Sequence, residues 1–299
     1  MNIMKNGVII IKKEEGMSSA RVVSAVKRLL SPDKAGHTGT LDPMATGVLP
    51  ILLNRGVKAS ELMLTSDKHY IATLKLGVTT DTEDIWGEAL TRSESIPAEA
   101  EVMRAVASFV GPYMQTPPMY SALKRDGKKL CDLARAGITV EREPREVTIH
   151  SIVCTPTDKA DEYSLDVVCS KGTYIRTLCA DIGASLGCGG CMASLCRAEA
   201  SGFTLSDART LSEIEALPPD ERWSLVIPVE EIFKKYDKIT LQPFFARLAR
   251  SGLEIYLKKI GVELALGSLV TLFDKDGFFA LGEVREYPDG PAIKPIRQF

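Results

Sequence analysis

The sequence predicts an α+β protein in which a large first unit is followed by a small β-rich unit. Residues 70–76 and 163–169 alternate apolar with polar side chains, as strands with one buried face do. Residues 18–30 and 175–186 instead repeat apolar residues at helical spacing. From about residue 238 the segments become short and Asp-Gly and Pro-Asp-Gly turns separate them. The second unit therefore begins near that point.

The elements of the first half follow one another in a simple order. A buried strand is expected at residues 7–11, and Ser18 and Ser19 then begin the first helix. After this helix we expect a polar loop at residues 36–47, an apolar segment at 48–53, a short helix at 58–64 and the strand that Tyr70 opens.

The second half begins with an amphipathic helix at residues 98–110, and Pro117 and Pro118 then exclude regular structure. A turn at residues 171–173 joins the strand at 163–169 to the next helix, so Arg176 should lie near a helix start. In the small unit we expect a helix at 242–251 and strands at 269–273 and 278–284.

Composition indicates an ordinary globular protein. The chain has 299 residues, 45% of them hydrophobic and 25% charged. The apolar run at residues 7–11 is too short for a signal core or a membrane span, so we expect a cytoplasmic protein without membrane contact. Seven unpaired-looking cysteines suit a reducing compartment, and Cys188 and Cys191 lack the second pair that a zinc site usually needs.

Charge is distributed unevenly. The net charge of −2 argues mildly against nucleic-acid binding. However, residues 1–34 hold seven Lys or Arg against three acidic residues, and residues 121–145 hold seven against four. Residues 81–101 hold one against seven. The distribution predicts basic and acidic faces, or else solvated surfaces without a function.

The loop at residues 36–47, GHTGTLDPMATG, is the strongest local signal for a site. It is too polar and too rich in glycine for a helix or strand, and Pro43 restricts the chain directly after Asp42. No second carboxylate, metal-ligand spacing or phosphate-binding sequence accompanies Asp42, so we expect neither a metal nor a nucleotide cofactor. Asp42 is either a turn residue or an ionised nucleophile whose pKa a guanidinium, with Arg176 as candidate, would lower.

Several motifs in order along the chain resemble the bacterial tRNA pseudouridine synthase B (TruB) family. They are GHTGTLDP at 36–43, GMSS at 16–19, Tyr70 with LGVTTDTED at 76–84, QTPPMYSALK at 115–124, KGTYIRTL at 171–178 and the tail at 267–299. Together they extend over essentially the whole chain. The resemblance implies the pseudouridine synthase fold, with a mixed, largely antiparallel sheet and packed helices in residues 1–236, and a PUA-like RNA-binding domain in residues 237–299.

The resemblance also implies a reaction and its residues. The enzyme would extrude the uridine at position 55 of the tRNA T loop, detach the uracil from ribose, turn it and rejoin it through C5, without a cofactor. Asp42 would act on the ribose as nucleophile or base, Arg176 would be its ion-pair partner, and Tyr70 would stack on the base and help to remove the C5 proton.

Further residues are expected to bind the substrate. His37 would enter the RNA near the flipped nucleotide, unless it only caps its own loop. Tyr174 and Leu195 match positions that line the uracil pocket, although core packing is the alternative for both. Asp84 matches a polar position near the RNA. Lys13 and Lys124 complete the set, and residues 117–142 would form a basic thumb over the tRNA, unless this charge run is a solvated face.

The chain departs from the family pattern in three places. Lys12, Lys13 and Glu14 replace an Asp-Lys-Pro segment, Cys196 stands where the family commonly has an arginine, and Cys131 replaces a tyrosine near the thumb. Because Asp42, Tyr70 and Arg176 are all present, these departures concern RNA affinity more than catalysis.

Three functions remain open at this point. The first is the synthase, a monomer whose partner is the tRNA T stem-loop. The second is a non-catalytic tRNA-binding or tRNA-folding module on the same scaffold, against which the Asp, Tyr and Arg set argues. The third is hydrolysis of a small nucleoside, which would need neither the basic thumb nor a terminal domain.

Overall fold

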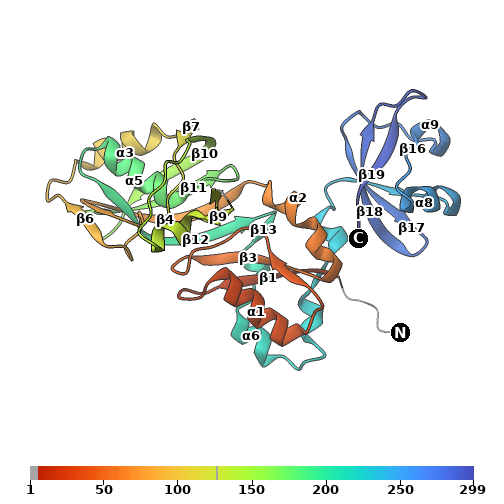
Figure 1. Ribbon diagram of the computed structural model, residues 1–299, viewed down its shortest axis with the longest axis horizontal. Helices are drawn as coiled ribbons and strands as arrows, with labels where there is room; N and C mark the ends of the chain where they lie inside the picture. The colour runs from red at the N-terminus through yellow and green to blue at the C-terminus, as the bar shows by residue number, and fades with distance from the viewer. Residues whose placement is uncertain (1–5, 126) are drawn as a thin grey trace.

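The computed structural model describes residues 6–125 and 127–299 and contains a large and a small β-sheet, each with its own helices (Figure 1). The strand order in the large sheet is β14-β1-β3-β12-β4-β11-β10-β7, with β2 paired to β3 and β13 to β12. Its neighbouring strands are antiparallel except for β3 and β12. The predicted α+β class with a mixed, largely antiparallel sheet is therefore confirmed.

The strands of the large sheet are β1 Gly7–Lys13, β2 Ala35–His37, β3 Thr46–Leu53, β4 Lys68–Leu76, β7 Gly111–Gln115, β10 Arg145–Pro156, β11 Glu162–Cys169, β12 Gly190–Ala200, β13 Phe203–Thr204 and β14 Ile227–Pro228. Two separate hairpins are β5 Val78–Thr80 with β6 Ala89–Arg92, and β8 Lys124–Arg125 with β9 Lys128–Lys129. The helices of this unit are α1 Ser19–Leu30, α2 Ser60–Leu64, α3 Glu99–Ala107, α4 Leu130–Arg135, α5 Ile175–Ser185, α6 Leu211–Ala216 and α7 Val229–Ile232, with 3-10 turns at Asn54–Ala59, Leu205–Asp207 and Arg222–Leu225.

The half of the sheet formed by β1 and β3 is covered on both faces. Ile9 and Ile11 pack in the cluster that contains the apolar face of α1. Val8 and Ile10 point the other way, into a cluster with Met63 of α2 and residues of the small unit. Burial on both faces explains why this segment is a continuous apolar run without alternation.

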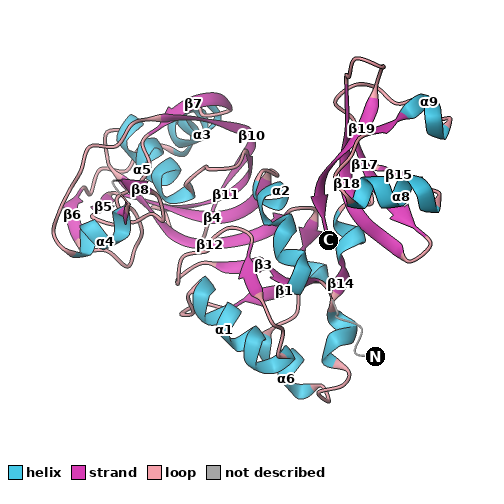
Figure 2. Cartoon of the chain, turned by 45° about the vertical axis from the view of Figure 1, so that its right-hand side comes forward, coloured by secondary structure: helices cyan, strands magenta, loops and turns pink. Residues whose placement is uncertain are grey.

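The half formed by β4, β11 and β10 is covered mainly on one face, by α5 and α3 (Figure 2). Ala72 and Leu74 are fully buried there, whereas Ile71 on the opposite face is 41% exposed. One-sided burial produces the alternation that identified residues 70–76 and 163–169 as strands.

The two halves meet at a short parallel seam between β3 and β12. Cys196 faces Thr46, and Arg197 faces Gly47. Gly47 has a φ of +103°, and a Cβ atom at this position would lie 2.3 Å from the carbonyl oxygen of Arg197. Only glycine therefore lets the strand that leaves the Asp42 loop approach β12 so closely.

We expect Gly47→Ala to lower the free energy of unfolding by about 2 kcal/mol or more, because it combines an unfavourable φ with an overlap against backbone. Urea denaturation measures this as a lower midpoint at unchanged slope. Gly16→Ala is a matched control, since Gly16 also has a positive φ (+86°) but open space at its Cβ position. Equal losses for both variants would contradict the role of the close approach.

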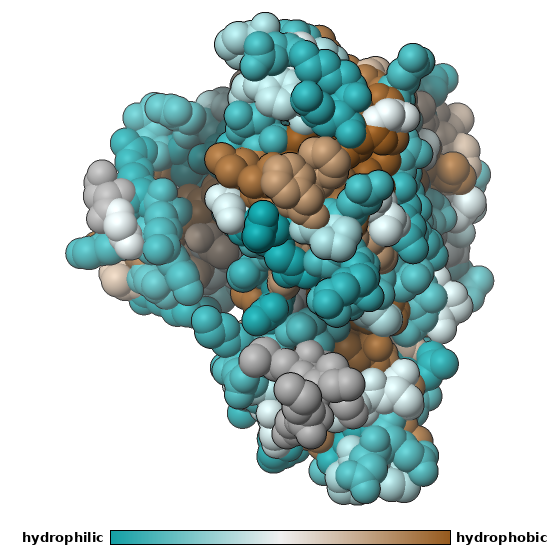
Figure 3. Space-filling view, turned by 90° about the vertical axis from the view of Figure 1, so that its right-hand side faces the viewer, coloured by the Kyte–Doolittle hydropathy of each residue, from teal (hydrophilic) through white to brown (hydrophobic). Residues whose placement is uncertain are grey.

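The small unit is a five-stranded sheet in the order β15-β17-β18-β19-β16. Its elements are β15 Asp237–Thr240, α8 Pro243–Arg250, β16 Ile255–Tyr256, α9 Leu257–Ile260, β17 Leu269–Asp274, β18 Gly277–Arg285 and β19 Ala292–Gln298. It contacts the large unit through Leu281, Phe278 and Phe233 in a shared apolar cluster, and Arg297 pairs with Glu61 at 2.6 Å. Seen from the right-hand side of Figure 1, the surface of the molecule is mostly hydrophilic, and a hydrophobic patch lies in the upper part of this view (Figure 3).

The structure differs from the sequence predictions in three places. Residues 36–37 and 46–47 of the predicted loop are strand residues, because the first end of the loop pairs with the apolar segment and the second end pairs with β12. The helix expected at 58–64 is a 3-10 turn followed by a short α-helix. Several strands were not predicted, among them β7 and β10 of the large sheet and β15, β16 and β19 of the small one. No helix of the described residues is long and apolar enough to span a membrane.

Candidate active site

The loop that carries Asp42 is fixed to the start of α1. Ser18 caps this helix, and the next residue, Ser19, is buried. The hydroxyl of Ser19 accepts a hydrogen bond from the backbone N–H of Leu41 at 2.9 Å and lies 3.0 Å from the Leu41 carbonyl, to which it donates. The Ser19 hydroxyl thus binds both the N–H and the carbonyl of Leu41, the residue directly before Asp42.

Lys13 holds the other side of the loop. Its side chain is buried, and Nζ donates to the carbonyls of Ala45 at 2.5 Å, Glu14 at 3.0 Å and Pro43 at 3.1 Å. Burial lowers the pKa of Lys13 to about 8, although the nearby Asp42 carboxylate opposes the shift. In the structure the 1% exposed Lys13 donates to two carbonyls of the loop and to that of Glu14, which gives it a supporting role; substrate binding by Lys13 stays a prediction.

Arg176, at the start of α5, brings three segments together. Nε lies 2.9 Å from Oδ2 of Asp42, and the two side chains are 5% and 35% exposed. Nη1 donates to the carbonyl of Thr82 at 2.9 Å, and Nη2 donates to the carbonyl of Tyr120 at 2.7 Å. The predicted pairing of Arg176 with Asp42 is present, and the guanidinium also connects both residues to the loop after β5 and to the Pro-Pro segment.

The pKa of Asp42 differs in direction from the sequence expectation. Burial raises the pKa above the usual aspartate value, and the negative charge of Asp84 adds to the increase. Arg176 and Lys13 lower it, but they do not offset the loss of water around the carboxyl group. A carboxylate with a raised pKa is a better base and nucleophile than an exposed one, provided the pH keeps it ionised.

Asp84 is buried beside Arg176, with Oδ2 3.8 Å from Nη1. Its Oδ1 accepts hydrogen bonds from Thr82 and from the backbone of Trp86. Asp84 therefore adds negative charge near Arg176 and shapes its own loop. Glu83, which the sequence analysis missed, has a φ of +63° and accepts a hydrogen bond from Thr177 at 2.5 Å.

Tyr70 lies on β4 and packs partly buried against the main core cluster. Burial raises its pKa, and the neighbouring Arg197 opposes the shift, so the phenol is protonated at neutral pH. Arg197 faces Tyr70 across the β4–β12 pair. The ring therefore occupies the inner face of the sheet that meets α5, beside the parallel seam.

Arg197 is the largest fully buried side chain and the second residue that the sequence analysis missed. Nε donates to the carbonyl of Val48 at 2.8 Å and Nη2 to that of Gly39 at 3.3 Å. It thereby connects β12 to both ends of the Asp42 loop. An arginine at an inward position of a strand is the signal that could have identified it, since burial of this charge requires fixed partners.

His37 ends β2 and is half-buried. Burial lowers its pKa, and Arg197 lowers it further, so the ring is neutral at neutral pH. Its Nδ1 is buried and has no hydrogen-bond partner in the described part of the chain. The position of His37 near Arg197 places it at the Asp42 loop, and its insertion into RNA stays a prediction.

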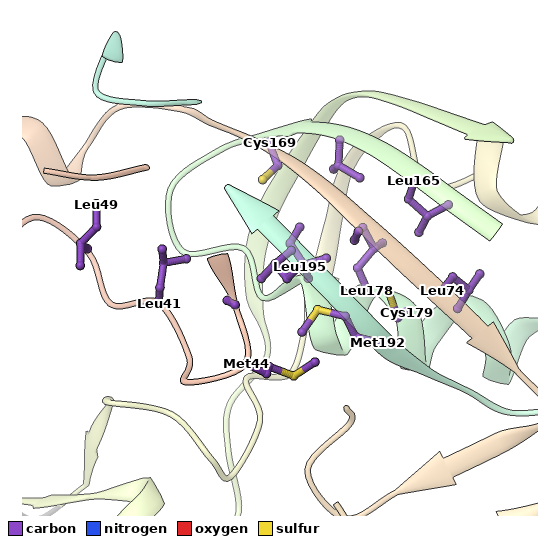
Figure 4. Packing of buried hydrophobic residues seen from close by; sticks show 14 of the residues in the cluster. Leu41, Met44, Leu49, Leu74, Leu165, Cys169, Leu178, Cys179, Met192 and Leu195 are labelled. Atoms are coloured by element: carbon purple, nitrogen blue, oxygen red, sulfur yellow. The ribbon is translucent and has the colours of Figure 1, made fainter. Parts of the chain in front are cut away.

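Leu195 and Tyr174 flank the site from β12 and from the start of α5. Leu195 is buried in the same cluster as Leu41 and Met44, the apolar residues on either side of Asp42 (Figure 4). Tyr174 caps α5, and its backbone exchanges two hydrogen bonds with the buried Gln115 side chain, at 2.8 and 3.0 Å. Tyr174 also lines a cavity of about 330 Å³.

Lys124 lies on the exposed β8–β9 hairpin, which carries Arg125, Lys128 and Lys129 as well. No ion pair within 4.0 Å joins these four cations to an acidic residue in the described ranges. At the base of the hairpin Leu130 and Cys131 donate backbone hydrogen bonds to the 121–123 segment, and Arg125 on β8 donates to the carbonyl of Glu141. The arrangement leaves its charge available to an anionic partner.

The chemistry that these residues allow is limited and specific. One partly exposed carboxylate, paired with a buried guanidinium, lies on a loop that Ser19, Lys13 and Arg197 hold in place. Such a group can attack a sugar carbon or remove a proton from it. The seven cysteines are all free.

Comparison with protein families gives two adjoining matches. The model described as "TruB family pseudouridylate synthase (N terminal domain)" matches residues 27–175, and that of the "tRNA pseudouridylate synthase B C-terminal domain" matches residues 176–234. Among curated proteins, the chain is similar to tRNA pseudouridine synthase B of Alkaliphilus oremlandii, with 43% identity over 94% of this chain and 93% of the relative. The same-named protein of Aromatoleum aromaticum is 41% identical over 93% and 88%.

Solved structures show the same fold at lower identity. A Cbf5-Nop10-Gar1 complex matches with a TM-score of 0.74 at 23% identity, covering 99% of this chain and 85% of that chain. A structure of "H/ACA RNP bound to a substrate RNA containing 2'-deoxyuridine" matches with a TM-score of 0.73 at 22% identity, covering 99% and 86%.

Proposed function

The chain belongs to the TruB family of pseudouridylate synthases and is an isomerase that acts on tRNA, and from this premise we propose that it converts the T-loop uridine at position 55 to pseudouridine. The observation that carries the proposal is the ion pair between Asp42 and Arg176 at 2.9 Å, because it presents a single, partly exposed carboxylate on a loop that is held in place. A non-catalytic module would not need a partly exposed carboxylate that a buried arginine holds in place.

In the proposed mechanism the uridine is extruded from the T loop, at a cost of a few kcal/mol that stacking offsets. The Asp42 carboxylate acts on the ribose, either at C1′ or by removing the C2′ proton, and the N1–C1′ bond breaks with both electrons leaving on uracil. The base turns, the C5–C1′ bond forms, and the C5 proton is removed. Tyr70 stacks on the base and takes part in that proton transfer, and Arg176 keeps Asp42 oriented.

The remaining site residues and domains fit supporting roles. Leu195 and Tyr174 line the uracil pocket, Asp84 and His37 lie near the flipped nucleotide, and Lys124 belongs to a thumb of residues 117–142 that closes on the T stem-loop. Residues 1–236 form the catalytic domain and residues 237–299 a PUA-like RNA-binding domain. We propose a cytoplasmic monomer without a cofactor.

The test is an assay on an unmodified T stem-loop RNA. We expect the purified protein to convert one uridine to pseudouridine in the presence of EDTA and without a nucleotide, measured as release of tritium from C5 and by nucleoside chromatography. The same RNA with cytidine at the target position is the control. Release of free uracil would indicate a hydrolase, and tight RNA binding without any conversion would indicate the non-catalytic module.

A further inference from the structure

The two ends of the thumb meet beside the loop that follows β5. Nη1 of Arg142, the last thumb residue, donates to the carbonyl of Pro117, the first, at 3.1 Å. Near the same end, the carbonyl of Tyr120 accepts from Arg176. Arg142 therefore closes the base of the thumb, and Arg176, the partner of Asp42, holds this base at the site.

Arg142 carries a donor that is not used. Its Nε is buried and has no hydrogen-bond partner among residues 6–125 and 127–299. Glu83 has complementary capacity, because Thr177 donates to its Oε2 while Oε1 accepts no hydrogen bond from the described residues. Burial raises the pKa of Glu83, and among the groups that oppose this shift are the guanidinium groups of Arg176 and Arg142.

Arg142 and Glu83 are thus electrostatic neighbours that have not formed an ion pair. In the described ranges no nitrogen of Arg142 comes within 4.0 Å of a carboxylate oxygen. Glu83 is well placed to transmit a contact, since Thr82 and Asp84 on either side both face Arg176. The Glu83 side chain accepts a hydrogen bond from Thr177, the residue after Arg176.

We propose that Arg142 is a positioning residue: when the thumb closes on tRNA, its guanidinium moves onto Oε1 of Glu83. This contact fixes residues 82–84, and with them the orientation of Arg176 beside Asp42. The inference rests on the proposed function, and it assigns to the base of the thumb a role in the rate of the reaction that is separate from RNA affinity.

The test is a double-mutant cycle with single-turnover kinetics on the T stem-loop RNA. We expect Arg142→Ala and Glu83→Gln each to lower the rate at saturating RNA about tenfold or more, with a Kd changed less than about threefold. The double variant should be no slower than the slower single variant, because both remove one contact. Arg142→Lys should recover part of the rate, since it retains the charge.

Arg104→Ala, which removes an exposed arginine from α3, controls for the change in net charge and should leave rate and Kd unchanged. The inference is overturned if Arg142→Ala weakens binding without affecting the saturating rate, or if the two substitutions act independently. A wild-type protein that makes no pseudouridine would instead remove the proposed function. In that case hydrogen exchange decides: tRNA should protect residues 80–84 in the wild type and not in Arg142→Ala, and equal protection would refute the coupling.

Discussion

Asp42→Asn is expected to abolish pseudouridine formation, with a rate about 10⁴-fold or more below wild type, while the Kd for tRNA changes less than about threefold. The amide has the shape of the carboxyl group but can neither attack the ribose nor take up its proton. Arg176 loses its ion pair but retains the carbonyls of Thr82 and Tyr120, so the variant should remain folded. Tritium release from C5 and filter binding measure the two quantities.

Asp33→Asn is the matched control, because Asp33 is an exposed aspartate shortly after α1 whose removal causes the same change in charge. It should match the wild type in both measurements. Substantial turnover by Asp42→Asn would assign the chemistry to another group. Loss of both binding and folding would leave the carboxylate untested in that variant, so Asp42→Glu, which retains the charge and displaces it, is measured in parallel and should also be inactive.

Local patterns predicted the elements whose burial is one-sided. Residues 70–76 and 163–169 alternate because one face of β4 and β11 meets α5 and the other is open. The helix start at Ser18 and Ser19 was likewise readable, because capping uses residues close in sequence. Strands β10, β15, β16 and β19 were not predicted. β15 and β16 are short and pair with distant segments, and irregularities in register interrupt the pairing of β10 and β19.

The reacting residues of the site could be predicted from the sequence better than the buried residues that hold them in place. Residue types and spacing indicated Asp42 and made Arg176 a candidate partner, and the family resemblance then implied the ion pair between them. The supporting role of Lys13 was not predicted, because lysines are usually exposed, whereas here its burial is compensated by three carbonyls. Arg197 was missed for the same reason. These buried cations depend on tertiary contacts that no local pattern reports.

Arg176→Lys should lower the rate at neutral pH about 10²- to 10³-fold and move the acid limb of the rate–pH profile to higher pH. A lysine has one terminal nitrogen and cannot bond Asp42, Thr82 and Tyr120 together, as the guanidinium does. Burial already raises the pKa of Asp42, and Arg176 opposes that shift. A weaker interaction with residue 176 raises the pKa of Asp42 further. Less of the carboxylate is then ionised at a given pH, and the rate should partly recover as the pH increases.

The profile of the wild type on the same RNA is the reference, and Arg104→Lys, which alters an exposed arginine of α3, should reproduce it. An unchanged acid limb in Arg176→Lys, with the rate lowered equally at every pH, would mean that Arg176 orients Asp42 without governing its ionisation. Both outcomes are distinguishable from a folding defect, because misfolding would reduce the active fraction measured in a single-turnover burst and leave the rate constant itself unchanged. The shift of the acid limb therefore tests directly whether the guanidinium keeps the Asp42 carboxylate charged at the pH where it must act.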